Sequence, residues 1–365
     1  MLATENLREA SRLMTICNAC RYCEGLCAVF PAMEMRRTFA DADLNYLANL
    51  CHGCGACYTD CQYSPPHEFN VNVPATFAKL RNDSYAAYAW PSLLSGAFAA
   101  NGVFVTLLTA LSMAAFIIGF VAWSDPAALW SANAGDFYKV MPHKAMVTVF
   151  GAVALYAVVA FALSLRAFWR DIAGDETAGV AAFGRALRDA AHLTYLHGGG
   201  GGCTSETDAP SPARRIFHHL TFYGFMLCFA ATCVATIYHY AFGWHAPYAP
   251  WSLPVVLGIV GGIGIVIGPI GLFVLMRRRD PTLRDLPRRG LDVAFIIMLV
   301  LVSVTGFALL VFRDTAALGL LLAVHLGVVL GLFLSMPYGK FVHGLYRFAA
   351  LVKYASERKR GTFVD

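Results

Sequence analysis

Eight of the eleven cysteines lie in residues 17–61, in two runs that share one spacing. The stretches "CNACRYCEGLC" (17–27) and "CHGCGACYTDC" (51–61) both read Cys-x2-Cys-x2-Cys-x3-Cys. This spacing is typical of bacterial ferredoxins that bind [4Fe–4S] clusters, in which the fourth cysteine of each run ligates the other cluster. We therefore predict one cluster on Cys17, Cys20, Cys23 and Cys61, and a second on Cys51, Cys54, Cys57 and Cys27.

The runs depart from ferredoxins in one detail. The proline that often follows the fourth cysteine is absent directly after Cys27 and Cys61. Zinc is the alternative metal, but zinc prefers paired Cys-x2-Cys units with four ligands per site, and a repeated triple run fits that pattern poorly. Because iron–sulfur clusters of this kind do no acid–base chemistry, we expect these sites to move single electrons.

The rest of the chain is strongly apolar. Of 365 residues, 58% are hydrophobic and only 14% are charged, and the mean hydropathy is +0.56. A soluble domain carries about a quarter charged residues, so the composition indicates a membrane protein. The net charge of +5 forms no basic stripe, and we expect no nucleic-acid partner. Six apolar stretches are long enough to span a bilayer, and they cover residues 93–121, 143–168, 217–241, 253–276, 291–312 and 316–336.

Lysine and arginine gather in alternate loops, which predicts the orientation. One side receives the basic loop 277–289 and the C-terminal "ERKR", whereas the opposite loops hold only Lys139, Lys144 and Arg313. The N-terminus shows no apolar segment followed by a cleavage site. We therefore expect a multi-pass protein of the bacterial inner membrane, in contact with lipid, with both termini and the iron–sulfur domain in the cytoplasm. Five or seven spans with a re-entrant segment are the alternative.

The expected fold is mainly α-helical and has three parts. Residues 1–85 form a ferredoxin-like domain with two clusters, residues 90–345 form a six-helix transmembrane haem-binding bundle, and residues 346–365 form a basic tail. The longest cytoplasmic loop, residues 170–215, contains five consecutive glycines at 198–202. That loop is either a flexible linker or a segment that covers a cofactor or docks a partner.

Histidines in or near the spans are candidate metal ligands. An ionisable side chain inside a membrane is costly, so it is a functional candidate by default, and neutral imidazole is a usual axial ligand of haem. The alternative role for each of these histidines is to hydrogen-bond a backbone carbonyl instead of ligating a haem. No CxxCH motif is present, which argues against covalently attached haem. The candidates for one haem b or two are His143, His218, His219, His239, His325 and His343.

Spacing suggests how these histidines pair. His325 and His343 are 18 residues apart, which is five turns of a continuous helix, so they would share one face, although Pro337 can kink the helix between them. The third and sixth spans run in opposite directions. We therefore expect one pair near the cytoplasmic side, between His218 or His219 and His343. A second pair nearer the outside would join His239 and His325, and His143 competes with His239 for that outer position.

Three further stretches carry a resemblance to a known family. "LHGGGGGC", "RRIFHHLTFYGFMLCFAATCVATIYHY" and "MPYGKFVHGLYR", together with the two cysteine runs and six spans, resemble the tricarballylate- or citrate-utilisation protein B family (TcuB/CitB) over essentially the whole chain. The chain is also similar to the C-terminal part of CobZ, a fusion protein of cobalamin synthesis. His325 and His343, with Pro337-x-x-Lys340 between them, resemble the haem-ligating span of the respiratory nitrate reductase gamma subunit.

The resemblance implies a partner, which is a separate FAD-dependent dehydrogenase of tricarballylate or citrate. The expected function is reoxidation of that flavin, with electrons passing through two [4Fe–4S] clusters and haem b to quinone as acceptor. The chain would then be the electron-transfer subunit of an oxidoreductase system, and quinone reductase activity is open. One alternative is a membrane anchor or assembly subunit with structural clusters. Another is a redox sensor that uses Cys203 as an exposed reactive thiol.

Overall fold

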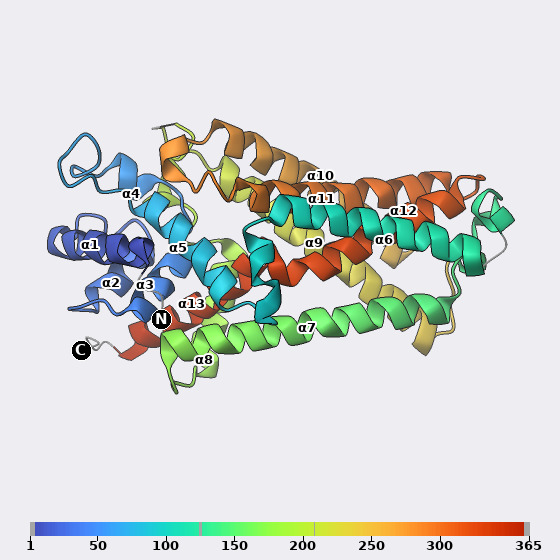
Figure 1. The fold of residues 1–365 in the computed structure, drawn as a ribbon, viewed down its shortest axis with the longest axis horizontal. Helices are drawn as coiled ribbons and strands as arrows, with labels where there is room; N and C mark the ends of the chain where they lie inside the picture. The colour runs from blue at the N-terminus through green and yellow to red at the C-terminus, as the bar shows by residue number, and fades with distance from the viewer. Residues whose placement is uncertain (1–3, 124–125, 208, 361–365) are drawn as a thin grey trace.

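The computed structural model describes residues 4–123, 126–207 and 209–360. Over these ranges the chain is mainly helical and forms no β-sheet, and Cys203 and Ser211 form an isolated antiparallel bridge. Figure 1 shows an elongated molecule with the N-terminal helices gathered at one end and long helices running to the other. The expected helical fold class is therefore confirmed.

The N-terminal part is a small helical domain, here called the cluster domain (residues 4–89). Its core contains the fully buried side chains of Leu13, Met14, Phe30, Leu47 and Phe77. Thr4 caps the first helix by accepting a hydrogen bond from the amide of Leu7. The cysteine runs lie between these helices, which are α1 (Glu5–Cys20), α2 (Val29–Glu34), α3 (Asp41–Leu50), α4 (Ala56–Thr59) and α5 (Val73–Ala87).

The expected basic tail at 346–365 is instead largely a packed helix. Helix α13 (Val342–Arg360) joins the core of the cluster domain, because Tyr346, Ala350 and Tyr354 recur at four-residue intervals and are buried on one face. Near its end, Glu357 forms a buried ion pair with Arg36 of the cluster domain at 2.5 Å. The last part of the expected tail, residues 361–365, lies outside the described residues.

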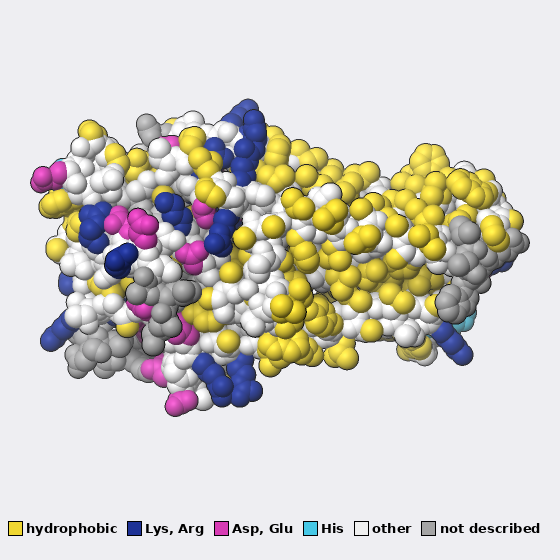
Figure 2. Space-filling view, in the orientation of Figure 1, with side chains coloured by type: hydrophobic (Ala, Val, Ile, Leu, Met, Phe, Trp, Pro, Cys, Tyr) yellow, Lys and Arg dark blue, Asp and Glu magenta, His cyan; other side chains and the backbone are white. Residues whose placement is uncertain are grey.

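Among the described residues, six helices are long and apolar enough to cross a membrane, as the sequence predicted. Figure 2 shows hydrophobic side chains covering this part of the molecule, whereas charged side chains gather at the end formed by the cluster domain. This distribution is compatible with a multi-pass membrane protein. The six helices are α6 (Asn101–Trp123), α7 (His143–Ala173), α9 (Ala213–Ala241), α10 (Leu253–Arg278), α11 (Arg289–Phe312) and α12 (Leu318–Ser335).

The first span starts later than predicted. The expected stretch began at residue 93, but residues Ser92–Phe98 form the short 3-10 helix η1, and α6 begins at Asn101. Phe98 is 2% exposed and packs into the core of the cluster domain, which draws this segment away from the spans. The side-chain amide of Asn101 then donates to the carbonyl of Tyr338 at 2.8 Å and ties the start of α6 to the end of the sixth span.

The sixth span ends in a break that separates two candidate histidines. After Ser335 the chain forms the 3-10 helix η7 (Met336–Tyr338), which contains Pro337, and passes through an extended Gly339 before α13 begins. Proline removes a helical amide donor and clashes with the preceding turn. His325 therefore lies on α12 and His343 on α13, and the shared face expected on a continuous helix does not form.

Helix α9 packs closely along α10 through small residues. A Cβ atom added at Gly224 would lie 2.8 Å from the carbonyl oxygen of Gly261, and one added at Gly268 would lie 2.5 Å from the hydroxyl of Thr221. Glycines at such contacts allow membrane helices to approach closely. This packing uses one face of α9 and leaves the face with His218 turned toward α13, where the rings of Phe225 and Phe341 lie 5.6 Å apart.

The long loop predicted at 170–215 contains a helix of its own. Helix α8 (Val180–His192) packs on α13, with the rings of Phe183 and Phe348 5.2 Å apart and Ala186 fully buried. Residues 193–212 then run over the cluster domain and return to the start of α9, with position 208 outside the described residues. This segment is here called the covering loop.

Candidate cofactor sites

The first group of thiols lies at the end of α1. Cys17 and Cys20 are in the last turn of that helix, which Arg21 ends in a left-handed conformation with φ of 54°. Burial, together with the neighbouring thiols of Cys23, Cys61 and Cys20, raises the pKa of Cys17 to about 12. One of these neighbours, Cys61, comes from the other run. The fold thus brings together the four cysteines that the spacing assigned to one cluster.

The second group lines a cavity between α2, α3 and α5. Cys51 ends α3, Cys57 is in the one-turn helix α4, and Cys27 precedes α2. Left-handed glycines at 53 and 55 turn the chain around Cys54, with φ of 63° and 91°. The wall of this cavity includes all four cysteines assigned to the second cluster, namely Cys27, Cys51, Cys54 and Cys57.

Both groups are wider than a single-ion site. Nowhere in the part of the chain that the structure describes do three His, Cys, Asp or Glu side chains converge closely enough to hold one metal ion. A four-iron cluster has an iron for each thiolate, so its four cysteines surround a larger volume than the ligands of one ion do. The two groups therefore suit clusters in shape and in chemistry, because each supplies four sulfur ligands.

The covering loop closes over the second group. The amide of Thr204 donates to the carbonyl of Cys54 at 3.0 Å, and the hydroxyl groups of Thr59 and Thr204 lie 2.9 Å apart. A Cβ atom added at Gly198 would lie 3.1 Å from the Cβ of Ala56 and 3.9 Å from the Cys54 sulfur. Of the two alternatives left open for this loop, the contacts favour a segment that covers a cofactor.

Cys203 is buried within the covering loop. It is 1% exposed, its thiol donates to the carbonyl of Leu196 at 3.7 Å, and burial raises its pKa. A reactive sensor thiol is exposed and has a lowered pKa. The exposed Cys203 on which the sensor alternative depended was therefore a wrong expectation.

A Gly202→Ala variant should uncover the second group of thiols. Gly202 has φ of 122°, and an added Cβ atom would lie 2.7 Å from the backbone of Ser211, so the bridge between Cys203 and Ser211 must open. Backbone strain of this kind costs about 1–3 kcal/mol. We expect faster bleaching of cluster absorbance in air. Gly200→Ala is the matched control, because φ is 111° but no atom lies within 4 Å, and equal rates in both variants would contradict the role of the contact.

Two candidate histidines face each other at the end of the spans nearest the cluster domain. The rings of His218 on α9 and His343 on α13 have centroids 6.1 Å apart and planes inclined by 74°. The Nδ1 atom of His343 donates to the carbonyl of Lys340 at 2.5 Å, which leaves its Nε2 free. The Nδ1 atom of His218 is buried without a hydrogen-bond partner. We call these two residues the inner pair.

The inner pair fits the ligand set of a haem. A metal–imidazole bond is about 2 Å long and the ring centre lies roughly 1 Å beyond the nitrogen, so two axial imidazoles have centroids on the order of 6 Å apart. A bonded Nδ1 that fixes the tautomer and leaves Nε2 free is the usual arrangement in a metal-ligating histidine. The separation of the two rings and the bonded Nδ1 of His343 agree with this arrangement. In His218 the unpartnered nitrogen is Nδ1, which leaves that atom free to bind a metal.

His219 and His325 lie apart from the inner pair. His219 turns toward α8 and Tyr223, with ring centroids 5.7 Å apart, and its Nε2 is buried and unpartnered. His325 points its Nδ1 at the hydroxyl of Thr305 on α11 at 2.8 Å, and its ring packs on Gly306. His218, rather than His219, is therefore the neighbour of His343, and the structure does not bring His325 next to His239.

The outer end of the spans holds a different histidine group. His143 and His239, which were predicted as alternative ligands for the outer position, are stacked with ring centroids 3.9 Å apart and planes inclined by 14°. The Nδ1 atoms of His239 and His245 lie 2.9 Å apart. Stacked rings this close leave no room for an iron between them. His245 was missed in the sequence because it lies in a polar turn outside every predicted span.

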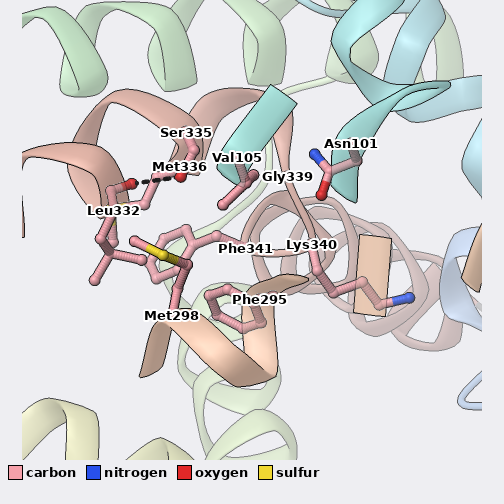
Figure 3. Close-up of a pocket in the computed structure, with 10 residues that line it drawn as sticks. All are labelled: Asn101, Val105, Phe295, Met298, Leu332, Ser335, Met336, Gly339, Lys340 and Phe341. Carbon is pink, nitrogen blue, oxygen red and sulfur yellow. Dashed lines mark hydrogen bonds between the residues drawn. The ribbon is translucent and has the colours of Figure 1, made fainter. Parts of the chain in front are cut away.

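A small cavity lies where α6, α11 and α12 meet the segment that leads to His343. Figure 3 shows apolar side chains filling its centre, with Lys340 extending away from them. The amine of Lys340 forms an ion pair with Asp292 at 2.8 Å. The cavity is too small for a quinone ring with the side chains in these positions. Its lining comprises Asn101, Val105, Phe295, Met298, Leu332, Ser335, Met336, Gly339, Lys340 and Phe341.

Comparisons with known proteins agree along the whole chain. Residues 96–362 match the family model described as citrate utilization protein B, and residues 10–87 match its Fer4-like domain. The citrate utilization protein B of Escherichia coli is 49% identical over 363 residues, which cover 99% of this chain and 95% of that protein. No solved structure matches.

Proposed function

Because the chain belongs to the citrate utilization protein B family, with a Fer4-like N-terminal domain and six apolar helices, we propose that it is a membrane electron-transfer protein. It takes electrons from a separate FAD-dependent dehydrogenase of tricarballylate or citrate. It passes them through two [4Fe–4S] clusters toward the membrane and delivers them to quinone. In this proposal it carries haem b between the clusters and the acceptor.

One observation carries the proposal, namely that two arginines join the loop of the second cysteine group to the helices that carry the inner pair. The carbonyl of Gly53 accepts from Arg214 at 2.5 Å, and Arg214 lies one helical turn before His218. The carbonyl of Cys51 accepts from Arg347 at 3.1 Å, and Arg347 lies one turn after His343. The loop of the second group and the two helices that carry the inner pair are thus joined by two arginine side chains.

The two cysteine groups differ in exposure, which gives the path a direction. The turn that leads to Cys23 is open, with Tyr22 72% exposed and Glu24 and Gly25 also exposed. The second group lies under the covering loop and against the spans. We infer that the partner flavoprotein docks at the first group and that electrons leave the second group toward the inner pair.

His218 and His343 are the residues proposed to hold haem b. Haem would supply a one-electron centre whose potential depends on its axial ligands and their hydrogen bonds. The carbonyl of Lys340 orients the His343 ring and makes its Nε2 a better ligand. A second haem would need a partner for His325, whose Nδ1 is likewise fixed by Thr305.

The positions of the basic loops and of the apolar helices suggest the orientation of the protein in the membrane and the class of electron acceptor. The basic loops 277–289 and 170–215 lie beside the cluster domain, so the positive-inside rule supports a cytoplasmic cluster domain. The site of a soluble flavoprotein partner would then be in the cytoplasm. Quinone is the proposed acceptor because it is a lipid-soluble oxidant available to an apolar bundle.

The alternative is an anchor subunit whose clusters are purely structural. The electron-transfer proposal and the anchor alternative are distinguished by recording the absorption spectrum of the purified protein after it is mixed with its FAD-dependent dehydrogenase and substrate. We expect cluster bleaching and reduced b-type haem bands within the turnover time, followed by reoxidation when a soluble quinone analogue is added. A protein with both clusters but no b-type band and no reduction by the flavoprotein would be an anchor, and would contradict the proposal.

A further inference from the structure

Four arginines converge between the second cysteine group and the inner pair. Arg214 and Arg279 both donate to the carbonyl of Gly53, at 2.5 and 3.2 Å. Arg81 and Arg347 both donate to the carbonyl of Cys51, at 3.2 and 3.1 Å. They come from four elements, since Arg81 is on α5, Arg214 on α9, Arg279 just after α10 and Arg347 on α13.

No acidic side chain neutralises this group. In the described ranges no carboxylate lies within ion-pair distance of any of the four guanidinium groups. The two nearest acids are engaged elsewhere, Glu206 with the hydroxyl of Ser205 and Asp292 with Lys340. The Nε atoms of Arg279 and Arg347 are buried without partners, although all four guanidinium groups donate to backbone carbonyls. Their positive charge exceeds the negative charge of a [4Fe–4S] cluster with four thiolates, which indicates a further anion.

The spacing along each helix places two of these cations beside the inner pair. Arg214 precedes His218 by four residues on α9, and Arg347 follows His343 by four residues on α13. Residues four apart lie on the same face of a helix. Because each arginine also bonds the Cys51–Gly53 backbone, both lie on the cluster-domain side of the two imidazoles.

We propose that Arg214 and Arg347, supported by Arg81 and Arg279, form a carboxylate-binding site that holds the propionates of a haem ligated by His218 and His343. This inference rests on the proposed haem-binding function. Guanidinium groups suit carboxylates because their N–H donors match the two oxygens in geometry and charge. The two propionates would offset part of the charge of the four cations, and the site would place the negative end of the haem toward the cluster domain.

The test compares two ligands that differ only in the carboxylates. Full-length protein made without haem is titrated in detergent with protohaem and with its dimethyl ester, using the wild type, an Arg214→Gln/Arg347→Gln double variant and Arg277→Gln. Arg277 is exposed at the same end of α10 and serves as the matched control. Iron content is measured in parallel, because the double variant also loses two bonds to the loop of the second cysteine group.

We expect the wild type and Arg277→Gln to bind protohaem about tenfold or more tightly than the ester. The double variant should bind the two ligands with similar affinity, even where its iron content has fallen. An equal preference in wild type and double variant, or no preference in the wild type, would overturn the site. If wild type binds neither ligand, the proposed haem function itself fails.

A free carboxylic acid is the other source of the same chemistry. Citrate and tricarballylate are therefore added in millimolar excess to the wild-type titration. Unchanged discrimination between protohaem and ester supports the propionate site. Competition that removes the preference for protohaem would assign the arginines to a soluble carboxylate and would overturn the assignment to haem.

Discussion

A Cys27→Ala variant is expected to lose the cluster surrounded by Cys51, Cys54 and Cys57, although Cys27 belongs to the other run of the sequence. Cys27 lines the same cavity as those three residues. Removing one of four thiolate ligands should abolish that cluster, and the iron content should fall from about eight to about four per chain. Iron and sulfide analysis and the electron paramagnetic resonance spectrum of the reduced protein measure this directly.

Double variants show which cluster was lost. If Cys27 and Cys54 ligate the same cluster, a Cys27→Ala/Cys54→Ala variant should retain about four irons, no fewer than either single variant. Cys27→Ala/Cys20→Ala should lose nearly all iron. Cys203→Ala is the control, because its sulfur is buried close to Cys54 but is not among the four thiols of either group. The opposite pattern of losses in the two double variants would refute the exchange of ligands between the runs.

His218→Ala and His343→Ala are each expected to abolish the haem of the inner pair. The ring centroids lie 6.1 Å apart. The Nδ1 of His343 donates to the carbonyl of Lys340, which leaves its Nε2 for a metal, and the Nδ1 of His218 is buried without a partner. Loss of either axial ligand should remove the low-spin b-type spectrum and most bound haem. Reduced-minus-oxidised spectra and haem extraction quantify the effect, with iron content as a check that the cluster domain is intact.

His219→Ala is the matched control for this experiment. It removes an imidazole from the next position on α9, but that ring turns toward Tyr223 and α8. We expect it to keep its haem, and His143→Ala should do the same because its ring is stacked on His239. His325→Ala should keep the b-type bands of the inner pair. The ligand assignment would be wrong if the His219→Ala or His325→Ala variant lost its haem while the His218→Ala variant kept it.

Local spacing was sufficient to predict the fold class and to place the first three cysteines of each run together, whereas the exchange of Cys27 and Cys61 between the runs stays a prediction. Cys-x2-Cys-x2-Cys is a contact pattern within a few residues, so it does not depend on how distant elements pack. The six spans were equally predictable, because about twenty consecutive apolar residues match the length of a helix that crosses the hydrocarbon core of a bilayer. Boundaries were less reliable, and the start of α6 moved because Phe98 packs into the cluster domain rather than against lipid.

The position of α13 was decided by packing. Read along the sequence, residues 346–365 are basic and resemble a tail, but the apolar face of Tyr346, Ala350 and Tyr354 is completed by side chains of α3, α5, α7 and α8. The break after Ser335 lets the chain turn into that core. That turn places His343 at the boundary between the spans and the cluster domain, which a count of residues from His325 could not reveal.

By itself the sequence determined what chemistry is present, namely eight thiols in two interleaved sets and several imidazoles in an apolar chain. Only the tertiary structure decided which groups meet. It paired His218 with His343, stacked His143 on His239, and folded the glycine run over Cys54. It also collected four arginines from four separate elements. The physical reason is that cysteine motifs are local, whereas helix rotation and the burial of charge depend on contacts between residues far apart in the chain.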